Sequence, residues 1–292
     1  NTIRFFPDKK GLASGLITGG MGGAAIIAAP IANALIERYG VSQAFWRMGL
    51  AYALVGFFFS LFIRSAPKQI VPQTAATSEK APTKAITANK NWKEMLATPS
   101  FYLLILMFAM GAFSGLMIAS NASLIGQSMF GLSASAAAAY VSLYSLSNTS
   151  GRVFWGAVSD RIGQIRAVII IYSAIIFAFV LLVSVNQVWA FAVGIVTLGL
   201  CFGGVMGVFP GLVMDNFGPA NQGVNYGIVF IGFSSAAFVA PKVTASLAAA
   251  NNGDFTKAFY VAIAVVLIGL GLSLVYAKRK ADAVEAAVET IQ

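Results

Sequence analysis

Eight long apolar segments dominate this chain and leave it few ways to fold. A helix needs about 20 mostly apolar residues to cross a bilayer. The segments that meet this length are 13–35, 45–63, 101–126, 134–157, 167–185, 188–213, 224–249 and 255–277. They are too long for barrel strands and lack the alternation of apolar and polar residues that such strands show. The sequence therefore predicts an all-α, polytopic membrane protein with eight transmembrane helices.

The composition excludes several other classes of protein. Hydrophobic residues make up 58% of the chain and charged residues 10%, whereas soluble domains carry about 25% charged residues. Cys201 is the one cysteine, so no internal disulfide forms, and there is no histidine for a metal site or a catalytic triad. No pairing of a nucleophile with a base is visible. We expect neither an enzyme nor a cofactor.

The net charge of +9 follows from topology. Fourteen lysines and arginines fall on one side of the predicted membrane and three on the other. Cytoplasmic loops carry the excess of such residues, so both termini and the loop after residue 63 are predicted to be cytoplasmic. A nucleic-acid partner would need a soluble basic face, and none is present. We expect a monomer in the plasma membrane of a bacterium, with lipid as its surroundings.

A polar stretch separates the segments into two groups. Residues 64–100 read as a cytoplasmic linker, in which Trp92, Met95 and Leu96 predict a short interfacial helix. The predicted organisation is the end of an N-terminal six-helix bundle at 1–63, the linker at 64–100, a C-terminal six-helix bundle at 101–277 and a cytoplasmic tail at 278–292.

An internal repeat suggests how this organisation arose. The same residue type recurs 212 positions later for eight residues: Phe5, Pro7, Gly11, Gly15, Gly20, Ala24, Ala25 and Ala28. Four predicted helices lie between the linker and the second copy, whereas none precedes the first. Symmetry therefore predicts four helices before Asn1, so that this chain is an N-terminally truncated fragment. Its eight helices would be the fifth to twelfth of a transporter built from two six-helix halves.

Two cations lie inside predicted spans that hold no deep carboxylate: Arg152 and Lys242. A charge at the bilayer centre costs at least about 2.5–3.5 kcal/mol, so it is normally paired or functional. The natural partner is then an anion from outside the chain. Arg152 also shares one helical stripe with Tyr140, Tyr144 and Asn148, whose groups suit a carboxylate. The alternatives are that Arg152 locks the following loop and that Lys242 extends to the interface.

The loop after residue 155 carries a compact charged motif. Its members are Gly156, Asp160, Arg161, Gly163 and Arg166. A glycine allows close helix contact, and another can take the positive φ that a short turn needs. A charge cluster there could bias one conformation of a rocking bundle, although an ordinary basic loop would look similar. The pattern resembles the conserved loop motif of the major facilitator superfamily.

Further motifs resemble the oxalate/formate antiporter branch of that superfamily. They are residues 6–15, 66–69, 99–102, 115–118, 147–152, 215–218 and 225–227. The resemblance implies a twelve-helix fold and exchange of small carboxylates by alternating access. It also implies that Arg152 and Lys242 flank a dicarboxylate. Phe202 and Met206 would line the site, where related antiporters place aromatic residues, and Asn121 would add a polar group, although helix packing explains these three as well.

Three functions remain open at this point. The leading hypothesis is an exchanger of small carboxylate anions, because an empty cationic site is costly to reorient. A proton-coupled monocarboxylate symporter would need a titratable acid, which the eight predicted spans lack. A non-transporting sensor or remnant is the third hypothesis, because of the expected missing helices.

Overall fold

The computed structural model describes residues 5–63 and 89–289, and these residues form helices and connecting turns with no strand. The elements are η1 (Pro7–Lys9), α2 (Lys10–Ser60), α3 (Trp92–Leu96), α4 (Pro99–Phe130), α5 (Ala134–Ile162), α6 (Gln164–Ser184), α7 (Val188–Phe217), α8 (Gln222–Val229), α9 (Ile231–Ala249) and α10 (Thr256–Glu289). The all-α prediction is confirmed for the described residues.

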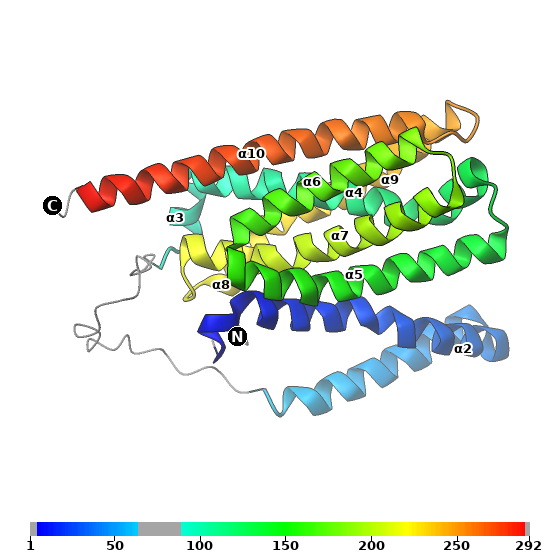
Figure 1. Ribbon diagram of the computed structural model, residues 1–292. Helices are drawn as coiled ribbons and strands as arrows, with labels where there is room; N and C mark the ends of the chain where they lie inside the picture. Colours follow the sequence, from blue (N-terminus) through cyan, green and yellow to red (C-terminus); the bar gives the residue numbers. More distant parts are fainter. Residues whose placement is uncertain (1–4, 64–88, 290–292) are drawn as a thin grey trace.

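Helix α2 is a hairpin of two helices joined at one residue. Gly40 has φ 77° and ψ 166°, a backbone conformation that glycine adopts without strain. In Figure 1 the light-blue second half runs back toward the end where the dark-blue first half begins, and the two halves diverge along the way. Across the break, the Arg47 guanidinium lies 3.4 Å from the centroid of the Tyr39 ring. The predicted segments 13–35 and 45–63 lie on either side of this break, which is shorter than the loop expected between them.

Helix α7 forms the centre of the bundle. It packs against α5, α6 and α4, while α5 also contacts the first half of α2 (Figure 1). Small residues allow the backbones of α5 and α7 to touch, because a Cβ at Gly203 would overlap the Asn148 carbonyl and one at Gly151 would overlap Leu200. This close contact holds α5 at a fixed distance from the centre of the bundle.

Five helical stretches in the described part are long and apolar enough to cross a membrane. They are Pro99–Phe130, Gln164–Ser184, Val188–Phe217, Gln222–Ala249 and Thr256–Asp282. The two halves of α2 and helix α5 are not among them, and α5 is rich in alanine and serine and contains Arg152. A multi-pass helical membrane protein is therefore supported, whereas the count of eight spans stays a prediction.

One end of the bundle gathers several chain ends. Figure 1 shows the start of α2, helices α3 and α8, and the last turns of α10 at this same end of the bundle. The predicted short helix is present as α3, where Asn91 accepts hydrogen bonds from the Lys93 and Glu94 amides. Most of the predicted linker, residues 64–88, lies outside the described residues. We call this end, which also carries Asp160, the Asp160 end.

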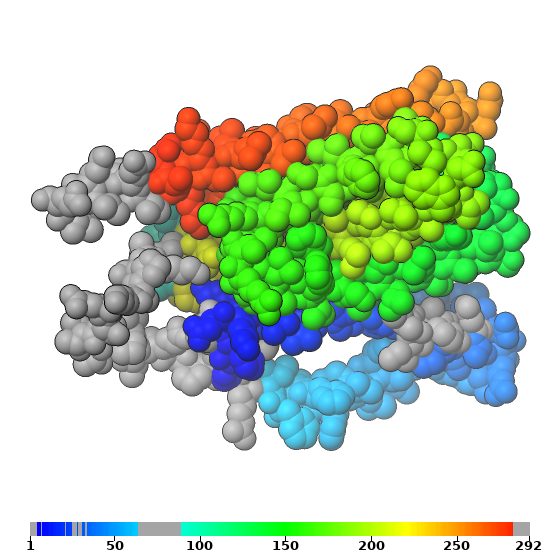
Figure 2. Space-filling model, viewed as in Figure 1, coloured from blue at the N-terminus to red at the C-terminus, as the bar shows by residue number. Residues whose placement is uncertain are grey.

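The second half of α2 stands apart from the bundle. Figure 2 shows this light-blue stretch separated from the green helices. Its large apolar side chains are exposed on several faces, with Phe45 at 73% and Phe57 at 68%. Such a surface suits contact with an apolar medium, as expected of a helix in lipid.

Candidate functional site

Arg152 is a charged side chain buried between three helices. It is 7% exposed. Its Nε donates to Asn148 Oδ1 at 3.1 Å, and its Nη1 donates to the Thr18 carbonyl of α2 at 2.6 Å. Gly22 leaves room for the guanidinium, because a Cβ there would lie 3.2 Å from Nε. The remaining nitrogen, Nη2, makes no hydrogen bond within the described part of the chain.

The residues of the stripe predicted on α5 make two kinds of contact. Asn148 and Arg152 are joined, as the spacing indicated. The Tyr144 hydroxyl instead donates to the Gly115 carbonyl of α4 at 2.7 Å. The Tyr140 ring packs on Phe191, with centroids 5.1 Å apart. Tyr144 lies within electrostatic range of Arg152, but its hydroxyl donates to Gly115 of α4 and leaves the guanidinium without a partner from this tyrosine.

Phe202 and Met206 form part of an apolar wall on α7, and both are buried. The Phe202 ring stacks on Tyr144 at 6.5 Å and on Phe233 at 6.4 Å between centroids. Gly115 makes space for it, because a Cβ at that position would overlap the ring. The wall thus joins α5, α7 and α9 through aromatic side chains.

Lys242 is exposed on α9, and its Nζ lies 3.6 Å from the centroid of the Phe238 ring. At 1.5 Å per residue, Lys242 lies about 30 Å along α8 and α9 from Gln222, whereas Arg152 lies about 12 Å along α5 from Asp160. Measured in this way, the two predicted cations lie at different depths along their helices.

Asn121 lies far from the Asp160 end of the bundle, about 33 Å along α4 from Pro99. Its Nδ2 donates to the Met117 carbonyl at 3.0 Å. It borders a cavity of about 470 Å³ between α4 and α9, which Gln127 and Ala245 also line. Asn121 thus lines the wall of this cavity, and the structure records no contact between Asn121 and Arg152.

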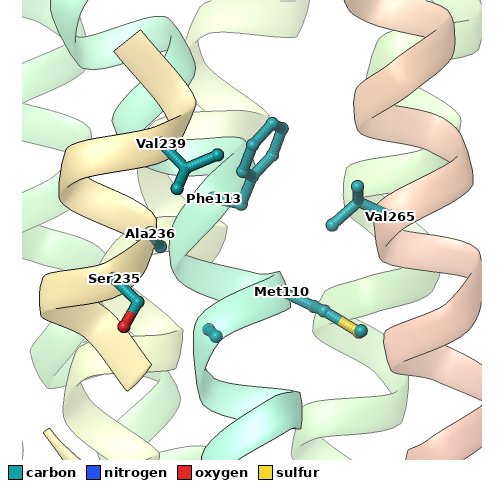
Figure 3. Close-up of a pocket in the computed structure, with 7 residues that line it drawn as sticks. Met110, Phe113, Ser235, Ala236, Val239 and Val265 are labelled. Atoms are coloured by element: carbon teal, nitrogen blue, oxygen red, sulfur yellow. The ribbon is translucent and has the colours of Figure 1, made fainter. Parts of the chain in front are cut away.

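A smaller cavity of about 190 Å³ lies between α4, α9 and α10. Figure 3 shows Phe113 and Val239 on one side and Val265 reaching from α10. Ser235 is the polar member of the lining, and its hydroxyl donates to the Ile231 carbonyl at 2.9 Å. With no cation in its wall, this cavity does not suit a carboxylate.

Asp160 fastens the start of α2 to the end of α5. Its two carboxylate oxygens accept hydrogen bonds from the backbone amides of Gly11 at 2.7 Å and Leu12 at 2.8 Å. Helix α2 has no side-chain cap of its own, so Asp160 satisfies amides that a helix start leaves unpaired. A negative charge at this position also interacts favourably with the helix dipole.

The other members of the loop motif take the predicted geometry. Gly156 and Gly11 bring the two backbones together, since a Cβ on either would overlap the carbonyl oxygen of the other. Gly163 ends α5 with φ 91°. Arg161 and Arg166 are exposed on either side of this turn.

An ion pair beside Asp160 was not foreseen from the sequence. Lys10 Nζ lies 3.1 Å from Asp215 Oδ1, and the two side chains are 25% and 12% exposed. The pair joins the start of α2 to the last turn of α7. Both residues stood in recognised motifs, but nothing in either motif names the other as a partner.

Comparison with known proteins places the chain in a family. The sequence profile of the Major Facilitator Superfamily matches residues 2–241. The chain belongs to the Major Facilitator Superfamily. The superfamily resemblance drawn from the loop motif at residues 156–166 is thereby confirmed.

Two curated members of the superfamily are similar to this chain. An uncharacterized MFS-type transporter, YhjX, from Escherichia coli (strain K12) is 33% identical over 235 residues, which cover 80% of this chain and 56% of that protein. The oxalate:formate antiporter of Oxalobacter formigenes is 28% identical over 272 residues, which cover 92% and 62%. The chain thus spans little more than half the length of either relative.

Proposed function

We propose that this chain is part of a secondary transporter that exchanges small carboxylate anions, such as oxalate and formate, by alternating access. The observation that carries the proposal is Arg152, a cation that is 7% exposed and hydrogen-bonded to neutral oxygens alone. A buried charge without a counter-ion is costly, so an anionic ligand would stabilise it. Similarity to an oxalate:formate antiporter supports the same class of substrate.

The positions of the acidic residues favour exchange over proton-coupled transport. In the described helices, Asp160 and Asp215 sit at the Asp160 end and already bind α2. Neither stands beside Arg152 as a proton acceptor. A carrier whose site keeps its positive charge reorients more easily when an anion is bound, which couples movement in one direction to movement in the other.

The remaining assignments belong to the same proposal. The eight predicted helices correspond to the fifth to twelfth of the superfamily fold, with the Asp160 end in the cytoplasm of a bacterial cell. Arg152 and Asn148 contact the substrate directly. Lys242 is the second cation proposed to contact the anion, reaching toward it from α9 through its long side chain. Tyr140, Tyr144, Phe202, Met206 and Asn121 shape the path around them.

The test compares Arg152→Gln and Lys242→Gln with Lys257→Gln, which removes an exposed cation at the start of α10. The measurement is equilibrium binding of oxalate and formate to the purified protein, with folding checked by thermal unfolding. Truncating one member of a buried charge pair costs roughly 2–5 kcal/mol. Arg152→Gln should therefore weaken binding at least about thirtyfold, whereas Lys257→Gln should leave it unchanged.

The effect of Lys242→Gln then indicates whether the substrate carries one carboxylate or two. If a dicarboxylate bridges both residues, Lys242→Gln should match the loss in Arg152→Gln, whereas a monocarboxylate should depend strongly on one of them. Arg152→Lys should also bind poorly, because lysine lacks the planar fork that pairs with a carboxylate. Unchanged affinity in both glutamine variants would reject the anion site.

A further inference from the structure

Tyr226, near the start of α8, differs from the other buried tyrosines of the described chain. Its hydroxyl is buried and has no hydrogen-bond partner there. The hydroxyls of Tyr144, Tyr172 and Tyr276 donate instead to Gly115, Met107 and Asn216. A buried tyrosine hydroxyl normally has a partner, so this one points to an acceptor that comes from outside the chain.

The Tyr226 ring is held firmly in place. It packs against Phe108 with centroids 6.2 Å apart and against Phe230 at 5.8 Å. The Phe108 ring in turn stacks on Phe209 of α7 at 4.6 Å. Since these apolar rings come from α4, α7 and the α8–α9 junction, the hydroxyl cannot easily swing to a new protein partner.

The charged group that interacts with this hydroxyl is Arg152, which lies within electrostatic range of it. Arg152 Nη2 makes no hydrogen bond in the described chain, so it also lacks an acceptor. Two donors on different helices, α5 and α8, thus lie within electrostatic range of each other, and the described residues supply neither with an acceptor. A carboxylate is a pure acceptor with two oxygens, and it can satisfy both.

We propose that the Tyr226 hydroxyl is a substrate ligand that donates a hydrogen bond to the carboxylate held by Arg152. The proposal rests on the function proposed above. It restricts the substrate to acceptor-rich anions, because a neutral or cationic solute would leave both donors unsatisfied. It also gives α8 a direct contact with the substrate, beside the contact that α5 makes.

Tyr226→Phe tests this assignment, since it removes the hydroxyl oxygen and keeps the ring contacts. The measurements are calorimetric binding of oxalate and of formate to the purified protein and the melting temperature without ligand. We expect the dissociation constants to rise about tenfold. The melting temperature should stay unchanged or rise, because the substitution removes an unsatisfied buried group. Tyr102→Phe, an exposed tyrosine of α4 at 55%, is the control and should change neither.

Each result decides the matter. If the unsubstituted protein binds oxalate or formate and Tyr226→Phe binds equally well, the hydroxyl is not a ligand, and a buried water is its partner. If affinity and melting temperature fall together, Tyr226 has a structural role and the proposal is wrong. If the unsubstituted protein binds neither anion, the proposed function itself fails and this assignment with it.

Discussion

The two ends of the bundle hold α2 in different ways. At the Asp160 end, Gly11 and Gly156 bring backbones together, and Asp160 and Lys10 add charged contacts. Further along α2 the helices α2 and α5 pack less closely, since a Cβ at Gly19 would lie 3.3 Å from Val153 and one at Gly23 would lie 3.5 Å from Thr149. Helix α2 is thus held most closely against α5 at the Asp160 end and less closely further along.

The largest expected effect on stability and uptake comes from adding a methyl group where α2 packs most closely on α5. In Gly15→Ala the new methyl group would overlap the Arg152 carbonyl, and overpacking of this kind costs about 1–3 kcal/mol. We expect a lower melting temperature and at least tenfold slower carboxylate uptake in proteoliposomes. Gly20→Ala, on the same helix, is the matched control and should be neutral or slightly stabilising, because alanine favours helix. Equal behaviour of the two variants would contradict the close packing of Gly15 against α5.

A smaller effect should follow from removing the charge that caps α2. Asp160→Asn keeps an acceptor oxygen but loses the charge, and a charge at a helix start contributes about 0.3–1 kcal/mol. We expect uptake about fivefold slower and substrate affinity nearly unchanged, since the residue acts on the conformational balance. Uptake and equilibrium binding measured on one preparation separate these effects.

Asp254→Asn supplies the control for that substitution. Asp254 caps the start of α10 within its own loop, through the Thr256 amide at 2.8 Å. It should lower stability without slowing uptake. A large loss of affinity in Asp160→Asn, with the turnover rate preserved, would show that Asp160 acts on the substrate site instead.

The smallest effect is expected at the ion pair. Partly exposed pairs contribute about 0.2–1 kcal/mol, so Lys10→Asp or Asp215→Lys alone should slow uptake about twofold to threefold. Combining them restores opposite charges across the same 3.1 Å contact. Uptake by the double variant should therefore recover most of the loss. A double variant slower than either single one would mean that each charge has its own separate role.

Much of the local structure could be predicted from the sequence. The long apolar segments led to helices, Trp92 to α3 and Gly163 to a turn with positive φ, because each depends on neighbouring residues. Gly40 shows the limit of this reasoning. The polar residues around it suggested a loop, whereas a single glycine is enough to reverse the chain.

Contacts between distant segments were harder to predict. Lys10 and Asp215 are 205 residues apart, and no local pattern links them. The spacing of Tyr144 placed it correctly on the face with Arg152, but could not show that Gly115 offers a carbonyl to its hydroxyl. Tyr226 was visible as part of a motif, yet its missing partner becomes apparent only when the surrounding rings are in place.

The hydrogen bond from Arg152 to the Thr18 carbonyl has a consequence for affinity. That oxygen belongs to the protein, so a carboxylate that binds Nη1 as well as Nη2 must compete with it at an effective concentration that diffusion cannot change. Apparent affinity falls by the fraction of time that the guanidinium is engaged in this way. Under the proposed function, the Thr18 carbonyl therefore competes with the substrate for Nη1 of Arg152. A bound anion would then be released quickly, because the Thr18 carbonyl oxygen can take its place as the acceptor.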